Sequence, residues 1–232
     1  MGLGLGLPLP GAADIASARF SEPTERYGHG VLGDPSEHAA ISVRLADGGS
    51  AVLRWDRPMV FEDVEPRLID IDGDGGQELL VVESHERLGA RFAVYDVRDG
   101  ALVPIARNPF IGTRFRWLAI VGAGDLDGDG RVEIAYVDRP HLARTLRVWR
   151  LEPSGGVFNP VELASLPGVT NHRIGEEDIA GGLRDCGAGP EMIVADAGWR
   201  RLLAVRFDGT GLAARDIGPH AGRASFADAL GC

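Results

Sequence analysis

Short apolar segments recur along most of the chain, and within many of them apolar and polar residues alternate at a period of two. This alternation predicts β-strands that bury one face, because successive side chains of a strand point to opposite sides. The chain shows no run with the 3.6-residue spacing of an amphipathic helix. We therefore expect an all-β protein with strands throughout.

One strand recurs along the chain, and its clearest copies begin at a glutamate. Glu78-Leu-Leu-Val-Val and Glu133-Ile-Ala-Tyr-Val begin 55 residues apart, and Glu191-Met-Ile-Val-Ala-Asp196 begins 58 residues after the second copy. A fainter copy lies in residues 31–43. Repetition at this spacing predicts a fold built from four similar structural units.

Further strands occupy matching places in these units. Apolar runs precede the repeated strand at Arg67–Ile71 and Phe115–Val121. In each of the four units a further strand follows the repeated strand, at Ala51–Trp55, Arg91–Val97, Thr145–Leu151 and Leu202–Phe207 in turn. A weaker last strand follows in the second, third and fourth units, at Leu102–Arg107, Pro160–Ser165 and Leu212–Ile217. Four units of about four short antiparallel strands predict a small four-bladed β-propeller. A β-sandwich is the competing all-β fold, although it requires no repeated loop and strand.

Two acidic segments of nine residues stand directly before two of the repeated strands. They read Asp70-Ile-Asp-Gly-Asp-Gly-Gly-Gln-Glu78 and Asp125-Leu-Asp-Gly-Asp-Gly-Arg-Val-Glu133. Ca²⁺ takes about six to eight oxygen ligands, and positions 1, 3, 5 and 9 of a tightly curled loop supply carboxylates, with a carbonyl at position 7. The predicted ligands of two Ca²⁺ sites are Asp70, Asp72, Asp74, Gly76 and Glu78, and then Asp125, Asp127, Asp129, Arg131 and Glu133.

These loops differ from an EF-hand, which needs its bidentate acid at position 12 and a helix on each side. Position 12 is Val81 in one loop and Tyr136 in the other, and both lie in predicted strands. The corresponding positions are Leu183, Asp185, Gly187 and Glu191 in the last unit and Gly30, Leu32, Asp34 and His38 in the first. The last unit should keep the turn without the ion, and the first should bind none. An acidic, solvated turn is the alternative for the two intact loops.

The segment Gly122-Ala-Gly-Asp-Leu-Asp-Gly-Asp-Gly-Arg-Val-Glu-Ile-Ala-Tyr-Val137 resembles an FG-GAP or VCBS repeat, the blade of integrin-α-type propellers. The resemblance is strong over residues 65–83 and 117–138 and weak elsewhere, and the aromatic-Gly start of the motif is not kept. It implies a propeller fold with Ca²⁺ bound between two strands of a blade. Members of this family mostly mediate adhesion or protein binding, or decorate exported enzymes, so the resemblance leaves the activity open.

Charge and cysteine content narrow the choice of partner and compartment. The net charge is −10 and every basic side chain is arginine, so nucleic acid is a poor partner for this acidic chain. Cys186 and Cys232 are either one disulfide of an oxidising compartment or two free thiols. A propeller must tie its last blade to its first, and a tail that folds back over the last unit would bring the two sulfurs together.

Residues 1–13 are apolar and then small, which is typical of the second half of a secretory signal cleaved after Ala13, although no basic residues come first. A floppy apolar tail is the alternative. The segment is too short, and too often broken by Gly and Pro, to span a bilayer, and no later segment is suitable. We therefore expect a periplasmic or secreted protein whose residues 14–232 form one propeller domain.

The strands that precede the loops would be innermost in a propeller and line its channel. Several of these segments are polar or aromatic. Converging arginines, histidines and carboxylates at one mouth predict a site for an acidic peptide or a sugar, whereas internally paired arginines and acids would be purely structural. The candidate ligand-binding residues are Tyr27, His29, Arg114, Arg116, Trp117, His172, Arg173 and Glu176.

Three functions remain open from the sequence. The leading one is an exported calcium-binding module that recognises a protein or glycan. A polysaccharide hydrolase or lyase would need two acids on one face, and Glu176 with Asp178 fits a strand, whereas Glu177 would point the other way. A calcium-stabilised structural domain is the third. The sequence contains no Gly-x-Ser-x-Gly, P-loop or Cys-x-x-Cys motif and no residue set that commits it to a reaction.

Overall fold

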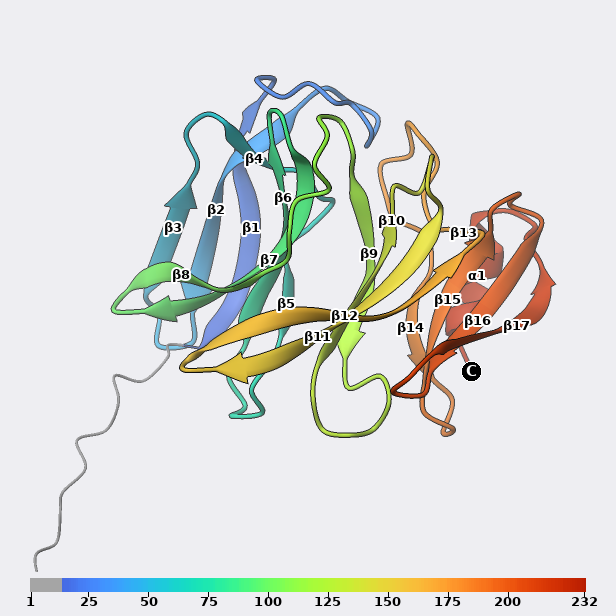
Figure 1. The fold of residues 1–232 in the computed structure, drawn as a ribbon. Coiled ribbons are helices and arrows are strands. Elements are labelled where there is room, and N and C mark those ends of the chain that lie inside the picture. Colours follow the sequence, from blue (N-terminus) through green and yellow to red (C-terminus); the bar gives the residue numbers. More distant parts are fainter. Residues whose placement is uncertain (1–13) are drawn as a thin grey trace, which may run out of the picture.

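The computed structural model describes residues 14–232, which form an all-β protein with three antiparallel sheets and one short helix (Figure 1). The predicted signal remnant, residues 1–13, lies outside the described residues. The all-β class is confirmed. The expectation of strands throughout is wrong for the C-terminal segment, where helix α1 spans Arg223–Leu230.

The first sheet has eight strands in the order β1-β2-β4-β6-β7-β8, with β3 beside β2 and β5 beside β6. The sequence pattern did not predict β1 and β4. The strands are β1 (Ile15–Thr24), β2 (Glu37–Leu45), β3 (Ser50–Arg54), β4 (Met59–Phe61), β5 (Arg67–Ile69), β6 (Glu78–His85), β7 (Gly89–Arg98) and β8 (Ala101–Arg107).

The other two sheets have the orders β12-β11-β10-β9 and β13-β15-β16-β17, with β14 beside β15. The strands are β9 (Leu118–Gly124), β10 (Glu133–Asp138), β11 (Thr145–Ser154), β12 (Val157–Pro167), β13 (Val169–Thr170), β14 (Gly182–Asp185), β15 (Pro190–Asp196), β16 (Arg201–Phe207) and β17 (Leu212–Pro219). The repeated strands β2, β6, β10 and β15 are all present. We call the four repeats unit 1 (β1–β3), unit 2 (β5–β8), unit 3 (β9–β12) and unit 4 (β14–β17).

The repeated strands of units 2 to 4 are buried on both faces. In β6, Leu79 and Val81 face unit 1, whereas Leu80 and Val82 pack against unit 3. Strand β10 divides its side chains between units 2 and 4 in the same way. A strand buried on both faces has an almost continuous apolar sequence, which explains Leu-Leu-Val-Val after Glu78. The core therefore consists of layers between stacked sheets.

Among residues 14–232 no sheet closes into a ring, so the predicted ring closure is not confirmed. Connecting loops of units 1 and 4 still touch, because the amide of Gly175 donates to the carbonyl of Val31 at 3.0 Å. In Figure 1, unit 1 and unit 4 lie at opposite sides of the molecule. The outer face of unit 4 is covered by α1, whose Phe226 is buried against Ile193, Ala195 and Leu202. The outer face of unit 1 is polar, with Ser17, Arg19, Arg44 and Ser50 exposed. A polar face and a helical cap protect the two ends without ring closure.

In two of the repeats, two short strands flank one side of the repeated strand where a single strand was expected. Strands β4 and β5 pair with opposite halves of β6, and β13 and β14 with opposite halves of β15. In unit 3 the same strand, β9, is continuous but contains an irregularity opposite Ala135 and Tyr136. Residues 171–181 therefore form a loop between β13 and β14. The other two candidate segments, residues 26–29 and 114–117, also lie in connections between strands. The prediction that the candidate residues lie on channel-lining strands is therefore wrong for all three segments.

A disulfide between Cys186 and Cys232, with a Cα–Cα distance of 5.5 Å, ties the C-terminal segment to the loop before β15. Arg184 also donates to the carbonyl of Ala229 at 2.6 Å. Both contacts hold α1 against unit 4. Within residues 14–232, no helix is long and apolar enough to cross a membrane.

Candidate functional site

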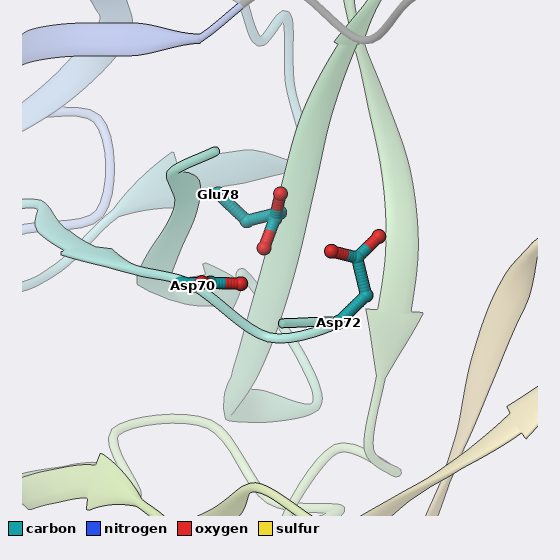
Figure 2. A group of neighbouring side chains, drawn as sticks. All are labelled: Asp70, Asp72 and Glu78. Atoms are coloured by element: carbon teal, nitrogen blue, oxygen red, sulfur yellow. The ribbon is translucent and has the colours of Figure 1, made fainter. Parts of the chain in front are cut away.

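The first acidic loop gathers three carboxylates. Oxygen atoms of Asp70, Asp72 and Glu78 lie within 4.8 Å of one another. Figure 2 shows the Asp70 and Asp72 side chains coming from the loop and Glu78 from the start of β6, with their carboxylates facing a common space. Burial and the nearby Asp72, Asp96 and Asp74 carboxylates raise the pKa of Glu78 to about 7. Such an arrangement concentrates hard oxygen donors.

The loop backbone wraps around its own side chains. The amides of Gly73 and Gly75 donate to Asp70 at 2.7 and 3.1 Å, and the amide of Ile71 donates to Glu78 Oε2 at 2.7 Å. Gly75 adopts a φ of +91°, which favours glycine. The sequence therefore specifies the turn locally, through glycines and Asx hydrogen bonds.

The second loop repeats this geometry. The amides of Gly128 and Gly130 donate to Asp125 at 2.7 and 2.9 Å, and the amide of Leu126 donates to Glu133 Oε2 at 2.9 Å. Oxygens of Asp125, Asp127 and Glu133 gather within 4.8 Å. Asp74 and Asp129, the predicted ligands at position 5, are not part of either three-carboxylate group. Three of the four predicted carboxylates of each loop are therefore brought together.

The two loops differ in the residue that pairs across the sheet with the closing glutamate. Glu133 is opposite Arg150 on β11. The guanidinium of Arg150 lies 2.5 Å from Asp127, 2.6 Å from Glu133 and 3.1 Å from Asp129. In unit 2 the corresponding residue on β7 is Asp96. Hence the second loop already holds a cationic side chain among its carboxylates.

The first loop is surrounded by additional acid. A methyl group at Gly76 would come within 2.6 Å of Asp14 Oδ1, so this carboxylate lies against the loop. Asp96 pairs with Arg98 at 2.8 Å. Among residues 14–232, no arginine or histidine forms an ion pair with Asp70, Asp72 or Glu78. The first loop is thus the more strongly negative of the two.

In unit 4 arginines surround the closing glutamate. Glu191 is buried and accepts hydrogen bonds from Arg184 at 2.6 Å and from Arg206 and Arg215 at 3.0 Å each. Asp185 retains the turn by accepting from the amides of Gly187 and Gly189. This loop therefore keeps its turn, and three guanidinium groups surround its closing glutamate. The expected turn is present.

The charge of Glu191 is expected to make stability depend on acid pH. Burial alone would raise the pKa of this carboxyl, but the three arginines outweigh it and lower the pKa from 4.5 to about 2. A depressed pKa stabilises the fold above pH 4.5, and this contribution of roughly 3 kcal/mol is lost as pH falls from 4.5 towards 2. Urea unfolding of Glu191→Gln against the parent at pH 6 and pH 3 measures it. An equal difference at both pH values would contradict the assignment.

Connecting loops of several units meet at the end of the molecule opposite the acidic loops (Figure 1). A cavity of about 310 Å³ lies among these loops. We call it the loop pocket. Its lining comes from the segment before β2, from the β8–β9, β10–β11 and β13–β14 connections, and consists of His29, Val31, Phe115, Arg116, Trp117, Arg139, Pro140, His141, Leu142 and Ile174.

Hydrogen bonds fix two histidines of the loop pocket. His29 Nδ1 lies 2.5 Å from Oε1 of the fully buried Glu62, which also accepts from the Ser84 hydroxyl. His141 Nε2 lies 2.9 Å from His172 Nδ1. Burial, together with His172 and His29, lowers the pKa of His141 to about 4, so this ring is neutral at physiological pH.

The structure brings together five of the eight predicted ligand-binding residues. His29, Arg116 and Trp117 line the loop pocket. Two more lie directly behind it, because His172 contacts His141 and the Tyr27 hydroxyl accepts from the amide of Phe115 at 3.0 Å.

The remaining predicted residues lie outside the lining. The Arg114 guanidinium stacks on Phe115 at 4.3 Å and that of Arg173 on Trp199 at 4.3 Å. Glu176 lies 4.0 Å from Arg173 and 4.0 Å from Arg223. Glu176 and Asp178, the two acids considered for a polysaccharide hydrolase or lyase, therefore lie on a loop surface beside arginines and not in the loop pocket.

Sequence reasoning missed the apolar part of the lining, chiefly Leu142 and Ile174. Both are exposed, at 63% and 72%, in otherwise polar connections. Large apolar residues in a predicted loop are the signal that could have identified them.

Residues 70–136 match the family model of the FG-GAP-like repeat. This segment runs from the first residue of the first acidic loop to strand β10 and contains both loops. It covers less than a third of the chain. No curated protein matches the chain. The resemblance inferred from the loop motif is confirmed for this part of the sequence.

Proposed function

We propose that this chain, which carries an FG-GAP-like repeat at residues 70–136, is an exported interaction module that binds one Ca²⁺ in each of its two acidic loops. The observation that carries the proposal is the recurrence of the same three-carboxylate group at equivalent places in units 2 and 3. Recurrence at matched repeat positions is difficult to explain by two independent acidic turns.

The donor set fits calcium. Each group offers only carboxylate oxygens, which suit a hard cation, and no cysteine or histidine that would favour a transition metal. Asp70, Asp72 and Glu78 would hold the ion in unit 2, and Asp125, Asp127 and Glu133 in unit 3, with Asp74 and Asp129 as further candidates. The bound ion would neutralise the acids and tie the loop to the first residue of the following strand.

An interaction role has more support than catalysis. Among residues 14–232 no carboxylate lines the loop pocket, and the Glu176–Asp178 segment forms ion pairs with arginines elsewhere. A purely structural role is disfavoured by Arg116, which forms no ion pair within residues 14–232. Export is supported by the Cys186–Cys232 disulfide, because such bonds persist in oxidising compartments.

Calcium titration of the purified chain should reveal two sites of unequal affinity, with the first loop the tighter because Arg150 occupies the second. Extracellular calcium modules bind at about 10⁻⁴–10⁻³ M. At 100 times Kd, one occupied site stabilises the fold by about 2.7 kcal/mol. Isothermal calorimetry and melting curves with and without chelator measure both effects. Zero or four sites would contradict the proposal.

Matched alanine variants at position 3 of each loop assign the sites. Asp72→Ala should remove the tighter calorimetric transition and Asp127→Ala the weaker one. Asp185→Ala, at the same place in unit 4, should change neither, because its loop lacks the acids at positions 1 and 5. An equal loss of calcium response in all three variants would show that the loops are not the binding sites.

A further inference from the structure

We infer that the loop pocket binds a peptide segment in which a carboxylate side chain neighbours a bulky apolar one. The inference rests on the proposed interaction function and not on calcium, because the loop pocket and the acidic loops lie at opposite ends of the molecule (Figure 1).

The apolar half of the ligand follows from the walls of the loop pocket. Trp117 is buried, Phe115 is partly buried, and Leu142 and Ile174 are 63% and 72% exposed at its edge. Exposed apolar residues beside a cavity mark a surface that gains stability when covered. A volume of about 310 Å³ is at the small end of ligand pockets, so it suits one or two side chains.

The anionic half follows from charge. The chain carries a net charge of −10, yet the lining contains Arg116, Arg139, His29 and His141 and no acid. Arg139 is already paired with Asp138 at 2.8 Å. The guanidinium of Arg116 donates to the carbonyl of Phe115 at 3.0 Å and has no acid partner among residues 14–232. A ligand carboxylate would supply that partner, in the charge-assisted geometry that arginine favours.

His29 adds a second polar group. Its Nδ1 lies 2.5 Å from Oε1 of the fully buried Glu62, which fixes the orientation of the ring. Its Nε2 forms no hydrogen bond with a described residue. This ring nitrogen is therefore free to form a hydrogen bond with a ligand.

These features favour an acidic peptide over a neutral sugar. Sugar hydroxyl groups need acceptors as well as donors, and arginine side chains accept no hydrogen bonds. In the described part of the chain, the lining contains no carboxylate and no amide side chain. An acidic apolar segment satisfies the donors and covers the exposed Leu142 and Ile174 at the same time.

Fluorescence polarisation with a labelled Gly-Ser-Gly-Leu-Asp-Gly peptide tests the inference in the full chain. We expect saturable binding, and at least tenfold weaker binding when Leu-Asp is replaced by Leu-Asn or by Ala-Asp. An acidic tetrasaccharide serves as the competing probe. Absence of binding at millimolar peptide, equal binding of all three peptides, or binding of the tetrasaccharide alone would overturn the inference.

Two variants separate the halves of the site. Arg116→Gln should weaken the Leu-Asp peptide at least tenfold and abolish the preference over Leu-Asn. Ile174→Ser should abolish the preference over Ala-Asp. Arg44→Gln and Val52→Ser, whose side chains are exposed on the outer face of unit 1, should bind like the parent. Unchanged binding in the first two variants, at unchanged melting temperature, would overturn the assignment of the pocket.

The calcium titration is measured on the same protein, so the two proposals fail separately. Loss of calcium binding with peptide binding intact would leave the loop pocket assignment standing and refute the metal sites. The reverse outcome would refute the pocket alone.

Discussion

Methionine in place of Arg150 should make the second loop a tighter calcium site while it destabilises the calcium-free protein. The guanidinium lies between Asp127 and Glu133, all three side chains are less than 10% exposed, and its charge occupies the region where a cation would bind. Removing it leaves buried acids without a partner, which costs about 3 kcal/mol without calcium. The calcium affinity of the second loop should rise at least tenfold in the variant, because the guanidinium no longer repels the ion.

Calorimetry gives the affinity, and urea unfolding in chelator gives the stability. Arg206→Met is the matched control, because Arg206 has the same cross-strand place in unit 4, where the loop lacks two acids. The converse change, Asp96→Arg, should weaken the first site by introducing the cation there. If Arg150→Met instead lowers calcium affinity, Arg150 supports the ligands and does not compete with the ion.

Loss of the Cys186–Cys232 disulfide should remove about 4 kcal/mol of stability in the chain-entropy model, given the sequence separation of 46 residues. That corresponds to a fall of roughly 10 °C in Tm for a chain of this size. The bond holds the segment that carries α1, and α1 covers the outer face of unit 4, where Phe226 is buried. Its loss should therefore also expose Ile193 and Leu202.

Thermal unfolding of the double variant Cys186→Ser, Cys232→Ser measures the fall in Tm. The parent protein should show the same fall in Tm when it is unfolded in reductant. Phe226→Ala is the control that removes helix packing while the disulfide remains. Hydrogen exchange should rise in β15 and β16 in both cases. Two alkylatable thiols in protein purified from an oxidising compartment, or unchanged Tm in the double variant, would contradict the prediction.

Local pattern was sufficient for most strands. Strand β6 was predicted to begin at Glu78 and β10 at Glu133, and both do. Both are central strands with apolar residues on two faces, so their signal in the sequence is strong. Strands β1, β4, β13 and β14 were missed, because each is defined by pairing with a partner elsewhere in the chain. Ile15 pairs with Leu45, and Met59 with His85.

The acidic loops could be recognised because their geometry is local. Asp70 is bonded to amides within five residues of itself, and Gly75 takes its left-handed conformation in the same turn. The difference between the loops could not be recognised. Arg150 and Asp96 reach the loops only through the pairing of neighbouring strands, and that register is a property of the folded sheet.

The sequence by itself determined the all-β class, the repeat, the two turns and the separate groups of candidate residues, because periodicity and Asx turns act within a few residues. Tertiary structure alone decided that the sheets stack openly, that α1 covers the last face, and that His29, Arg116 and His141 meet in one pocket. These outcomes depend on which sheet faces pack against one another, and the packed residues are far apart in the sequence. The summed burial of many side chains determines this packing, and no single segment encodes it.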